Sequence, residues 1–312
     1  MKLVSLAGNR AAVVLEEQVL CIADARHLVE ALGGAPDTVL GIVQAQADVV
    51  AGLNVVIADV QSNPDLRASL ASVGALLPVA SAELMPPLPD PKTIIGFGMN
   101  YTDHISEMKI DRPEDPPYLN KSVTSLVAPG GCIILPPDHS TMVDWEAELA
   151  VIIGRTCYRV SPADALGHVF GYTAANDVSA RDWVDVSYAA QGLMDTITKW
   201  GLNLLGKQFP TFCPLGPVIV TADELGDPNV LEIACHVNGE LMQQSNTENM
   251  VFSTAELISY ISKFQILQPG DIILTGTMSG IGFARKPRIF LQPGDRVDVE
   301  IEKIGVLSNV VA

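Results

Sequence analysis

Basic residues are scarce in this chain, and their scarcity limits the partners that it can have. Of 312 residues, 19 are lysine or arginine and 36 are aspartate or glutamate, which gives a formal net charge of -17 at pH 7. A surface of that sign repels nucleic acid and anionic membrane surfaces. The charge therefore predicts neither as a partner. An anionic ligand requires a pocket in which a metal ion or a few cationic side chains reverse the local field.

Cysteines and long apolar runs are scarce as well. The 5 cysteines are scattered without any Cys-x-x-Cys pair, so neither a disulfide framework nor a thiolate zinc site is indicated. No apolar run approaches the ~18 residues of a membrane span, and the first residues lack the apolar stretch of a signal peptide. These absences predict a protein of the reducing cytoplasm without a membrane partner.

A cluster of prolines marks one boundary in the chain. Residues 1–85 mix short alternating apolar segments with helical spacing around residues 40–58, which is typical of a small α/β unit. Residues 85–91, MPPLPDP, can continue neither a helix nor a central strand. Short β-branched segments bounded by turn residues follow. We therefore predict an α+β fold with a small N-terminal α/β domain over residues 1–85 and a mostly β domain over residues 91–312.

Two glutamates, Glu146 and Glu148, begin a β-branched segment that ends at Gly154. On a strand, positions i and i+2 share a face, so both carboxylates point into the same space. An isolated Glu-x-Glu is usually the solvent face of an edge strand, but residues 149–153 form a continuous apolar run typical of a strand buried on both faces. Two buried carboxylates repel each other unless a cation or protons intervene.

A third acid completes a pattern of potential metal ligands. Asp177 follows a second apolar segment, and no cysteine or histidine lies at ligand spacing from the three acids. Three carboxylate oxygens favour a hard, octahedral ion, Mg²⁺ or Mn²⁺, over zinc. Such a site leaves positions that a 2-oxo or 1,3-dioxo acid can chelate. The sequence therefore predicts a divalent metal site for a small anionic oxo acid.

A histidine and a glutamate upstream of the three acids form a candidate base. His104 and Glu107 face each other if their segment is helical. Glu107 could then orient the imidazole and raise its basicity. This spacing alone is more often a solvated helix start, but the nearby acids favour the catalytic interpretation.

The motifs, taken in order, resemble the fumarylacetoacetate hydrolase superfamily, and in particular its acylpyruvate hydrolases and 2-hydroxyhepta-2,4-diene-1,7-dioate isomerases. They are GMNYTDHISE (98–107), DWEAELAVIIG (144–154), GYTAANDVSARD (171–182), GKQFPTFCPLGP (206–217) and PGDIILTGT (269–277). The resemblance covers residues 91–312. It implies a mixed β-sandwich or roll in a homodimer, with a smaller N-terminal domain.

The resemblance also implies a role for individual residues. The metal ligands fall on Glu146, Glu148 and Asp177; the water-activating pair falls on His104 and Glu107; and the lysine that supports developing negative charge falls on Lys207. Further matching positions, expected to contact substrate or support the site, are Tyr101, Lys121, Arg181, Gly276 and Thr277.

Three departures from the family pattern lie near the expected pocket and bear on the substrate. Ser122 follows Lys121 where a proline is common, Met278 follows Thr277 where a proline is common, and Val184 follows Trp183 where a glutamine is common. The segment of residues 184–205 is also long compared with many relatives. These departures leave the expected metal site intact.

The function expected first is hydrolytic cleavage of a carbon-carbon bond in a small diketo acid, such as an acylpyruvate or fumarylpyruvate. The same metal ion would stabilise an enolate formed by other routes. Decarboxylation of oxaloacetate and isomerisation or hydration of an oxo acid therefore stay open as alternatives. A catalytically silent metal-binding homologue is the alternative of a different class.

Overall fold

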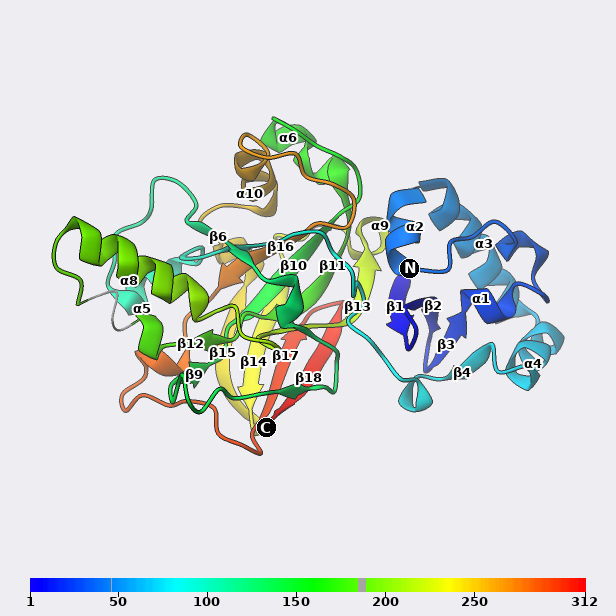
Figure 1. Ribbon diagram of the computed structural model, residues 1–312. Helices are drawn as coiled ribbons and strands as arrows, with labels where there is room; N and C mark the ends of the chain where they lie inside the picture. Colours follow the sequence, from blue (N-terminus) through cyan, green and yellow to red (C-terminus); the bar gives the residue numbers. More distant parts are fainter. Residues whose placement is uncertain (46, 185–188) are drawn as a thin grey trace.

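The structure is a computed structural model that describes residues 1–45, 47–184 and 189–312 (Figure 1). The larger of its two main sheets contains, in spatial order, β4 (Leu76–Pro78), β3 (Gln18–Cys21), β2 (Arg10–Leu15), β1 (Lys2–Leu6), β13 (Cys213–Thr221), β11 (Val169–Asn176), β10 (Ala147–Ile153), β16 (Ile272–Thr277), β5 (Ile94–Phe97) and β6 (Tyr118–Lys121), and β7 (Leu126–Val127) pairs with β13. The smaller sheet contains β15 (Glu240–Asn246), β14 (Glu232–Val237), β17 (Arg296–Ile301), β18 (Gly305–Val311) and β8 (Cys132–Ile133). The strands β9 (Val143–Asp144) and β12 (Ser179–Ala180) form a separate pair.

Helices surround these sheets. They are α1 (Ile22–Ala25), α2 (Val39–Ala45), α3 (Ala47–Ser62), α4 (Pro64–Ser72), α5 (Thr102–Met108), α6 (Pro162–Ala165), α8 (Leu193–Leu205), α9 (Ala222–Leu225) and α10 (Thr254–Ile261). A short 3-10 helix, η6, spans Gly282–Ala284. Within the described ranges, no single helix is both long and apolar enough to cross a membrane; α2 and α3 reach that composition only together, and they are bent by 119° at the break between them.

The two main sheets pack face to face and enclose the main core. Tyr172 and Val220 of the larger sheet share one cluster of buried apolar side chains with Cys235, Val299 and Leu307 of the smaller sheet. In β17, core-facing residues alternate with more exposed ones, as in a strand that covers a core with one face. The expected α+β fold with a mixed β-sandwich is thus confirmed.

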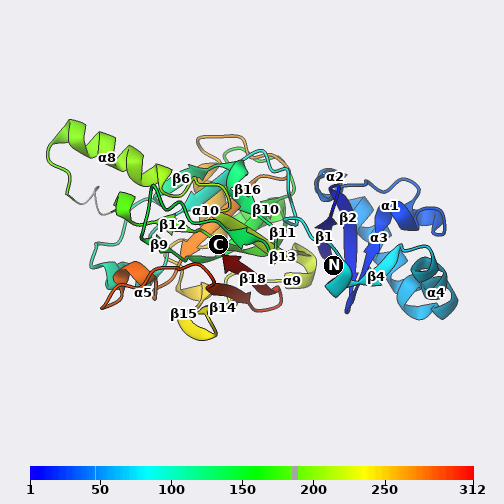
Figure 2. The ribbon, with the colours of Figure 1, turned by 60° about the horizontal axis from the view of Figure 1, so that its bottom comes forward.

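The N-terminal strands extend the larger sheet. β1 pairs with β13 in antiparallel register, with Lys2 opposite Val220, and Figure 2 shows the N-terminal strands and helices on one side of the molecule. Val43 and Val56 of the N-terminal helices share a buried cluster with Ile219 of β13. The sheet and this cluster therefore run across residues 85–91, and the division into two domains there stays a prediction.

The register at the centre of the larger sheet determines which acidic side chains meet. β10 lies between β11 and β16, and all of its residues are buried, which confirms the predicted strand buried on both faces. Ala147 of β10 lies opposite Asn176 of β11, and just beyond this pair the backbone N–H of Asp177 donates to the carbonyl of Glu146 at 2.8 Å. Antiparallel pairing therefore brings Asp177 beside Glu146 and Glu148.

Candidate metal centre and active site

Glu146, Glu148 and Asp177 form a compact carboxylate cluster. Each offers an oxygen within 4.8 Å of the others, and this is the one such group of three potential metal ligands found in the described part of the chain. Their exposed fractions are 6%, 1% and 3%. The spacing that indicated two glutamates on one face thus leads to a buried group of three acids.

Three basic side chains hold this cluster together. Lys207 Nζ donates to Glu146 Oε2 at 2.7 Å and also to Asp177 Oδ2. Lys121 Nζ donates to Asp177 Oδ1 at 2.6 Å, and Arg181 donates to Glu146 Oε1 at 2.6 Å. Glu148 instead accepts from the backbone N–H of Gly276 at 2.7 Å. Two of the three acids are therefore charge-paired, and Glu148 is not.

The carboxyl groups titrate differently for this reason. Burial favours the neutral form of Asp177, but Lys121 and Lys207 outweigh it and lower the pKa to about 2. Burial likewise opposes ionisation of Glu146, yet Lys207 and Arg181 hold its pKa below the ordinary value. The pKa of Glu148 is raised, first by burial and then by the charges of Asp177 and Glu146. The repulsion among the three carboxylates is therefore balanced by basic side chains at Glu146 and Asp177 but not at Glu148.

The chemistry of the site fits a hard divalent cation. Its donors are carboxylate oxygens, which Mg²⁺ and Mn²⁺ prefer, and a cation would relieve the repulsion at Glu148. The hydroxyl of Tyr101 is buried and has no hydrogen-bond partner among the described residues. Burial raises the pKa of that hydroxyl, and the charge of Glu148 raises it further. A buried polar atom without a partner next to an acidic cluster suits a site completed by an ion and its water ligands.

We expect Glu148→Gln to stabilise the metal-free protein and to weaken Mn²⁺ binding. The folded-state pKa of Glu148 lies above its ordinary value of 4.5, so ionisation of this carboxyl destabilises the fold as pH rises above that value, and the effect is absent at lower pH. The Tm of the metal-free variant should exceed that of the metal-free wild type at pH 7 and approach it near pH 4, measured by calorimetry. Unchanged Mn²⁺ affinity would exclude Glu148 as a ligand.

His104 and Glu107 form the second half of the site. Both lie on α5, so the helical segment that the sequence argument required is present. His104 Nδ1 lies 3.2 Å from Glu107 Oε2, and Glu107 Oε1 accepts from the backbone N–H of Gly280 at 2.9 Å. Asp103, on the same helix, accepts from Ser279 at 2.9 Å. The turn at residues 279–280 thus fixes α5 and orients the imidazole.

One pocket joins the two halves. A cavity of about 150 Å³ is lined by His104, Glu146, Arg181, Lys207 and Thr277 together with apolar side chains. Thr277 Oγ1 accepts from Gln243 at 2.8 Å and donates to the carbonyl of Ala147 at 2.9 Å. The candidate base, one acid of the cluster and Lys207 therefore open onto the same small space.

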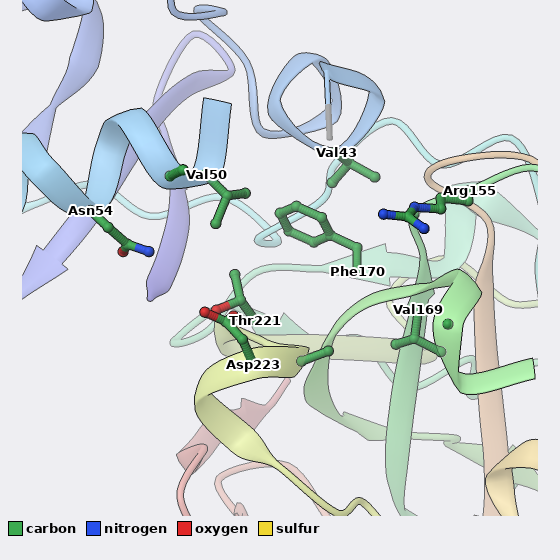
Figure 3. A pocket seen from close by; sticks show the side chains of 12 residues that line it. Val43, Val50, Asn54, Arg155, Val169, Phe170, Thr221 and Asp223 are labelled. Carbon is green, nitrogen blue, oxygen red and sulfur yellow. The ribbon is translucent and has the colours of Figure 1, made fainter. Parts of the chain in front are cut away.

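A larger hollow lies elsewhere, between the N-terminal helices and the larger sheet (Figure 3). Its volume is about 380 Å³, and Val43 and Val50 face Phe170, Thr221 and Asp223 across it. Neither His104 nor any member of the carboxylate cluster lines it. We therefore place the active site in the smaller pocket, because its lining contains His104, Glu146 and Lys207.

Three residues matched to the site by resemblance have other contacts. The Lys121 side chain is fully buried and donates to Asp177 and to the carbonyl of Lys207. Tyr101 and Gly276 do not line the pocket, and the N–H of Gly276 is bonded to Glu148. Lys121 and Gly276 therefore bind members of the carboxylate cluster without lining the pocket.

Sequence reasoning missed Asp144. This fully buried acid accepts from Arg181 Nε at 2.9 Å, and from the backbone N–H groups of Gly282 at 2.7 Å and Phe283 at 3.0 Å. Arg181 also donates to Glu146. Asp144 therefore connects the carboxylate cluster to η6, whose Phe283 lines the pocket. Its position two residues before Glu146 was the only available signal.

The long segment of residues 184–205 borders the pocket. Residues 185–188 lie outside the described part, but the following helix, α8, contributes Trp200, Asn203 and Leu204 to the lining. Trp183 donates to the carbonyl of His139 at 2.9 Å. The predicted departure from the family pattern therefore falls on the wall of the site.

Comparisons with known proteins show what this chain is similar to. The model of the fumarylacetoacetate (FAA) hydrolase C-terminal family matches residues 93–312. A Bos taurus protein named mitochondrial oxaloacetate tautomerase is 48% identical over 246 residues, which are 79% of this chain and 74% of that protein. A putative HpcE protein from Mycobacterium smegmatis has a TM-score of 0.78 and 30% identity, covering 100% of this chain and 99% of its own.

A solved maleylpyruvate hydrolase from Sphingobium sp. SYK-6 contains manganese(II) and pyruvate; its TM-score is 0.69 at 28% identity, covering 100% of this chain and 99% of its own. The Mg²⁺ or Mn²⁺ cofactor expected from the acids is thereby confirmed. The expected cytoplasmic location is contradicted, because the bovine and human relatives are named as mitochondrial proteins. Cysteine usage reports a reducing environment and does not distinguish one such compartment from another.

Proposed function

This chain belongs to the fumarylacetoacetate hydrolase family, and from that premise we propose that it catalyses keto-enol tautomerisation of a small 2-oxo acid. The observation that carries the proposal is the pairing of His104 with Glu107 at the pocket that also holds Glu146 and Lys207. The name of the similar bovine protein, oxaloacetate tautomerase, supports the same reaction. Among the functions expected from the sequence, we therefore favour isomerisation of an oxo acid over hydrolysis of a diketo acid.

Tautomerisation requires a proton to move between C3 and the oxygen on C2. His104 is 4% exposed, and Glu107 lies at its Nδ1. With Nδ1–H donated to Glu107, the free Nε2 accepts a proton from C3, and the imidazolium then donates that proton to the C2 oxygen, which completes the enol. Ketonisation runs through the same steps in reverse. Glu107 is itself held by Gly280, so the imidazole is oriented before substrate binds.

Negative charge develops on the C2 oxygen as the proton leaves C3. Lys207 Nζ is bonded to Glu146 and also lines the pocket. Burial opposes the charge of this group, but Asp177 and Glu146 outweigh burial and raise its pKa. Lys207 therefore stays protonated and stabilises the enolate electrostatically. Arg181 is held by Asp144 and Glu146, so its role is to position Glu146.

A divalent cation would be held by Glu146, Glu148 and Asp177. When bound, it supplies a Lewis acid that polarises the 2-oxo group. Lys121 and Gly276 keep two of these ligands in place through the hydrogen bonds described above. His104 moves the proton, and Lys207 stabilises the negative charge on the bound 2-oxo acid.

Hydrolysis of an acylpyruvate-like acid is the second candidate. It is favoured by the similarity to the maleylpyruvate hydrolase and by the same His104-Glu107 pair, which could take a proton from water. The pair also argues against a catalytically silent homologue. The homodimer implied by the family resemblance stays a prediction.

The test follows the enol of oxaloacetate after it is mixed with protein and Mn²⁺, using the absorbance of the enol and proton exchange at C3 in D₂O. We expect faster interconversion than with Mn²⁺ alone. A parallel reaction with an acylpyruvate reports released pyruvate. Cleavage of the acylpyruvate without any acceleration of tautomerisation would replace the proposed function by the hydrolase.

A further inference from the structure

One face of α8 and of the turn that follows it borders the pocket. Trp200, Asn203, Leu204 and Lys207, at positions i, i+3, i+4 and i+7, all line the cavity of about 150 Å³. Lys207 lies just beyond the end of α8, where its N–H donates to the carbonyl of Leu204 at 3.3 Å and continues the turn. The side chain of Lys207 is 15% exposed, and Trp200 is 55% exposed. Asn203 therefore lies between the buried ionic end of the pocket and its mouth.

The side-chain amide of Asn203 is a polar group of the lining that is not yet bonded. The arginine and lysine of the lining are bonded to carboxylates, and the Thr277 hydroxyl both accepts and donates a hydrogen bond. Within the described part of the chain, the Asn203 amide has no hydrogen-bond partner. The polar groups of Tyr118 and Trp200 have none there either, but these residues are 49% and 55% exposed, whereas Asn203 is half-buried. Asn203 is therefore the innermost of these unbonded donors.

The position of Asn203 suits a second carboxylate on the substrate. An ionised carboxylate only accepts hydrogen bonds, and the asparagine amide supplies two N–H donors. Without such donors, a carboxylate that enters a small pocket loses its water without a replacement, which is costly. Four residues of helix rise by about 6 Å, so Asn203 and Lys207 are separated by about the length of a four-carbon dicarboxylate. An acid whose C2 oxygen lies at Lys207 thus carries its C3 substituent toward Asn203.

Building on the proposed function, we propose that Asn203 is a specificity-determining residue that binds the second carboxylate of a dicarboxylic 2-oxo acid. Its Nδ2 donates to the carboxylate attached to C3, while the oxo-acid head group lies at the carboxylate cluster beside Lys207. The pocket thereby selects four-carbon dicarboxylic oxo acids, such as oxaloacetate, over monocarboxylic oxo acids of the same length.

Arg288 is the rival partner for this carboxylate. Its guanidinium carbon lies 3.9 Å from the centre of the Phe283 ring, and Phe283 lines the pocket. Arg288 itself lines a neighbouring hollow and does not belong to the described lining of the pocket. We therefore assign the second carboxylate to Asn203, and the experiment tests both residues.

The experiment compares oxaloacetate with 2-oxobutanoate, in which a methyl group replaces the second carboxylate. Initial rates of proton exchange at C3 give kcat/KM with Mn²⁺ for the wild type, Asn203→Leu, Asn203→Asp and Arg288→Met. Thr198→Val is the matched control, because Thr198 is exposed on the same helix and does not line the pocket. No residue of α8 is buried, and α8 projects from the body in both ribbon views (Figures 1 and 2). We therefore expect the variants to keep their fold, which circular dichroism checks.

We expect Asn203→Leu to lower the oxaloacetate-to-2-oxobutanoate ratio of kcat/KM by about tenfold or more, as for loss of a hydrogen bond to a charged group. Asn203→Asp should lower the ratio further, because it places a like charge beside the second carboxylate. Thr198→Val and Arg288→Met should keep the wild-type ratio. If Asn203→Leu slows both acids by the same factor, or if the ratio falls in Arg288→Met and not in Asn203→Leu, the proposal is overturned.

Binding of stable analogues separates this proposal from the proposed function. The Kd values of L-malate and of (S)-2-hydroxybutanoate, which do not tautomerise, are measured by calorimetry in the presence of Mn²⁺. We expect the wild type to bind L-malate about tenfold or more tightly than 2-hydroxybutanoate, and Asn203→Leu to lose this preference. If neither oxo acid exchanges its C3 protons faster than with Mn²⁺ alone, the tautomerase proposal fails, yet a preference for L-malate that depends on Asn203 still supports this inference. Equal Kd values in the wild type overturn it even if tautomerisation is fast.

Discussion

Exhaustive removal of divalent cations lowers kcat for oxaloacetate tautomerisation by about 10³-fold or more, and added Mg²⁺ or Mn²⁺ restores it. The reason lies in the cluster of Glu146, Glu148 and Asp177. These buried carboxylates repel an anionic acid, and Lys207 and Lys121 are bonded to them. Without a cation, the pocket therefore attracts the 2-oxo acid only weakly and polarises its carbonyl group poorly.

The measurement needs two controls. Free Mn²⁺ without protein gives the background rate, which is subtracted, and circular dichroism shows whether the chelated protein keeps its fold. Metal content is checked by mass spectrometry of the same samples. Full tautomerase activity in protein shown to be metal-free would contradict the proposed role of the cluster.

The carboxylate cluster could be predicted from sequence because short-range spacing and one strand pairing bring its members together. Glu148 lies on the buried strand β10 and Glu146 directly precedes that strand, so their two-residue spacing in extended backbone sets a common direction for their side chains. Asp177 joins them because β10 and β11 pair in antiparallel register, with Ala147 opposite Asn176. A strand pattern and the pairing of two neighbouring strands were enough to bring the three acids together.

The supporting contacts could not be predicted because they join distant parts of the chain. Asp144 receives hydrogen bonds from Gly282 and Phe283, more than a hundred residues away. β1 pairs with β13 across a similarly large separation. The local spacing of residues in such segments does not show which segments will pair, because tertiary packing sets their register.

Helix α8, which contributes to the pocket lining, shows a different limit of sequence-based prediction. The sequence identified residues 184–205 as unusually long, and helical periodicity describes α8, but periodicity alone assigns an apolar face to a protein core. In the structure no residue of α8 is buried. Whether an apolar helix face packs inside a protein or lines a substrate pocket depends on where its flanking segments are anchored.

We expect His104→Ala to lower kcat for tautomerisation by about 10²- to 10⁴-fold, the usual range for loss of a general base. Mn²⁺ affinity should not change, because His104 is not part of the carboxylate cluster. Proton exchange at C3 should fall by the same factor as kcat, since both report movement of one proton. Glu107→Gln should have a smaller effect, because the imidazole keeps its place but loses the charge that raises its basicity.

His27→Ala is the matched control, because His27 is exposed and lines neither pocket described above. The comparison is made at saturating Mn²⁺ and substrate, so that a change in the docking of α5, which alters binding, is distinguished from a chemical defect. A purely structural role of His104 would raise KM and leave kcat and C3 exchange near their wild-type values. That outcome would mean that another group moves the proton, since His104 would then only help α5 to cover the pocket.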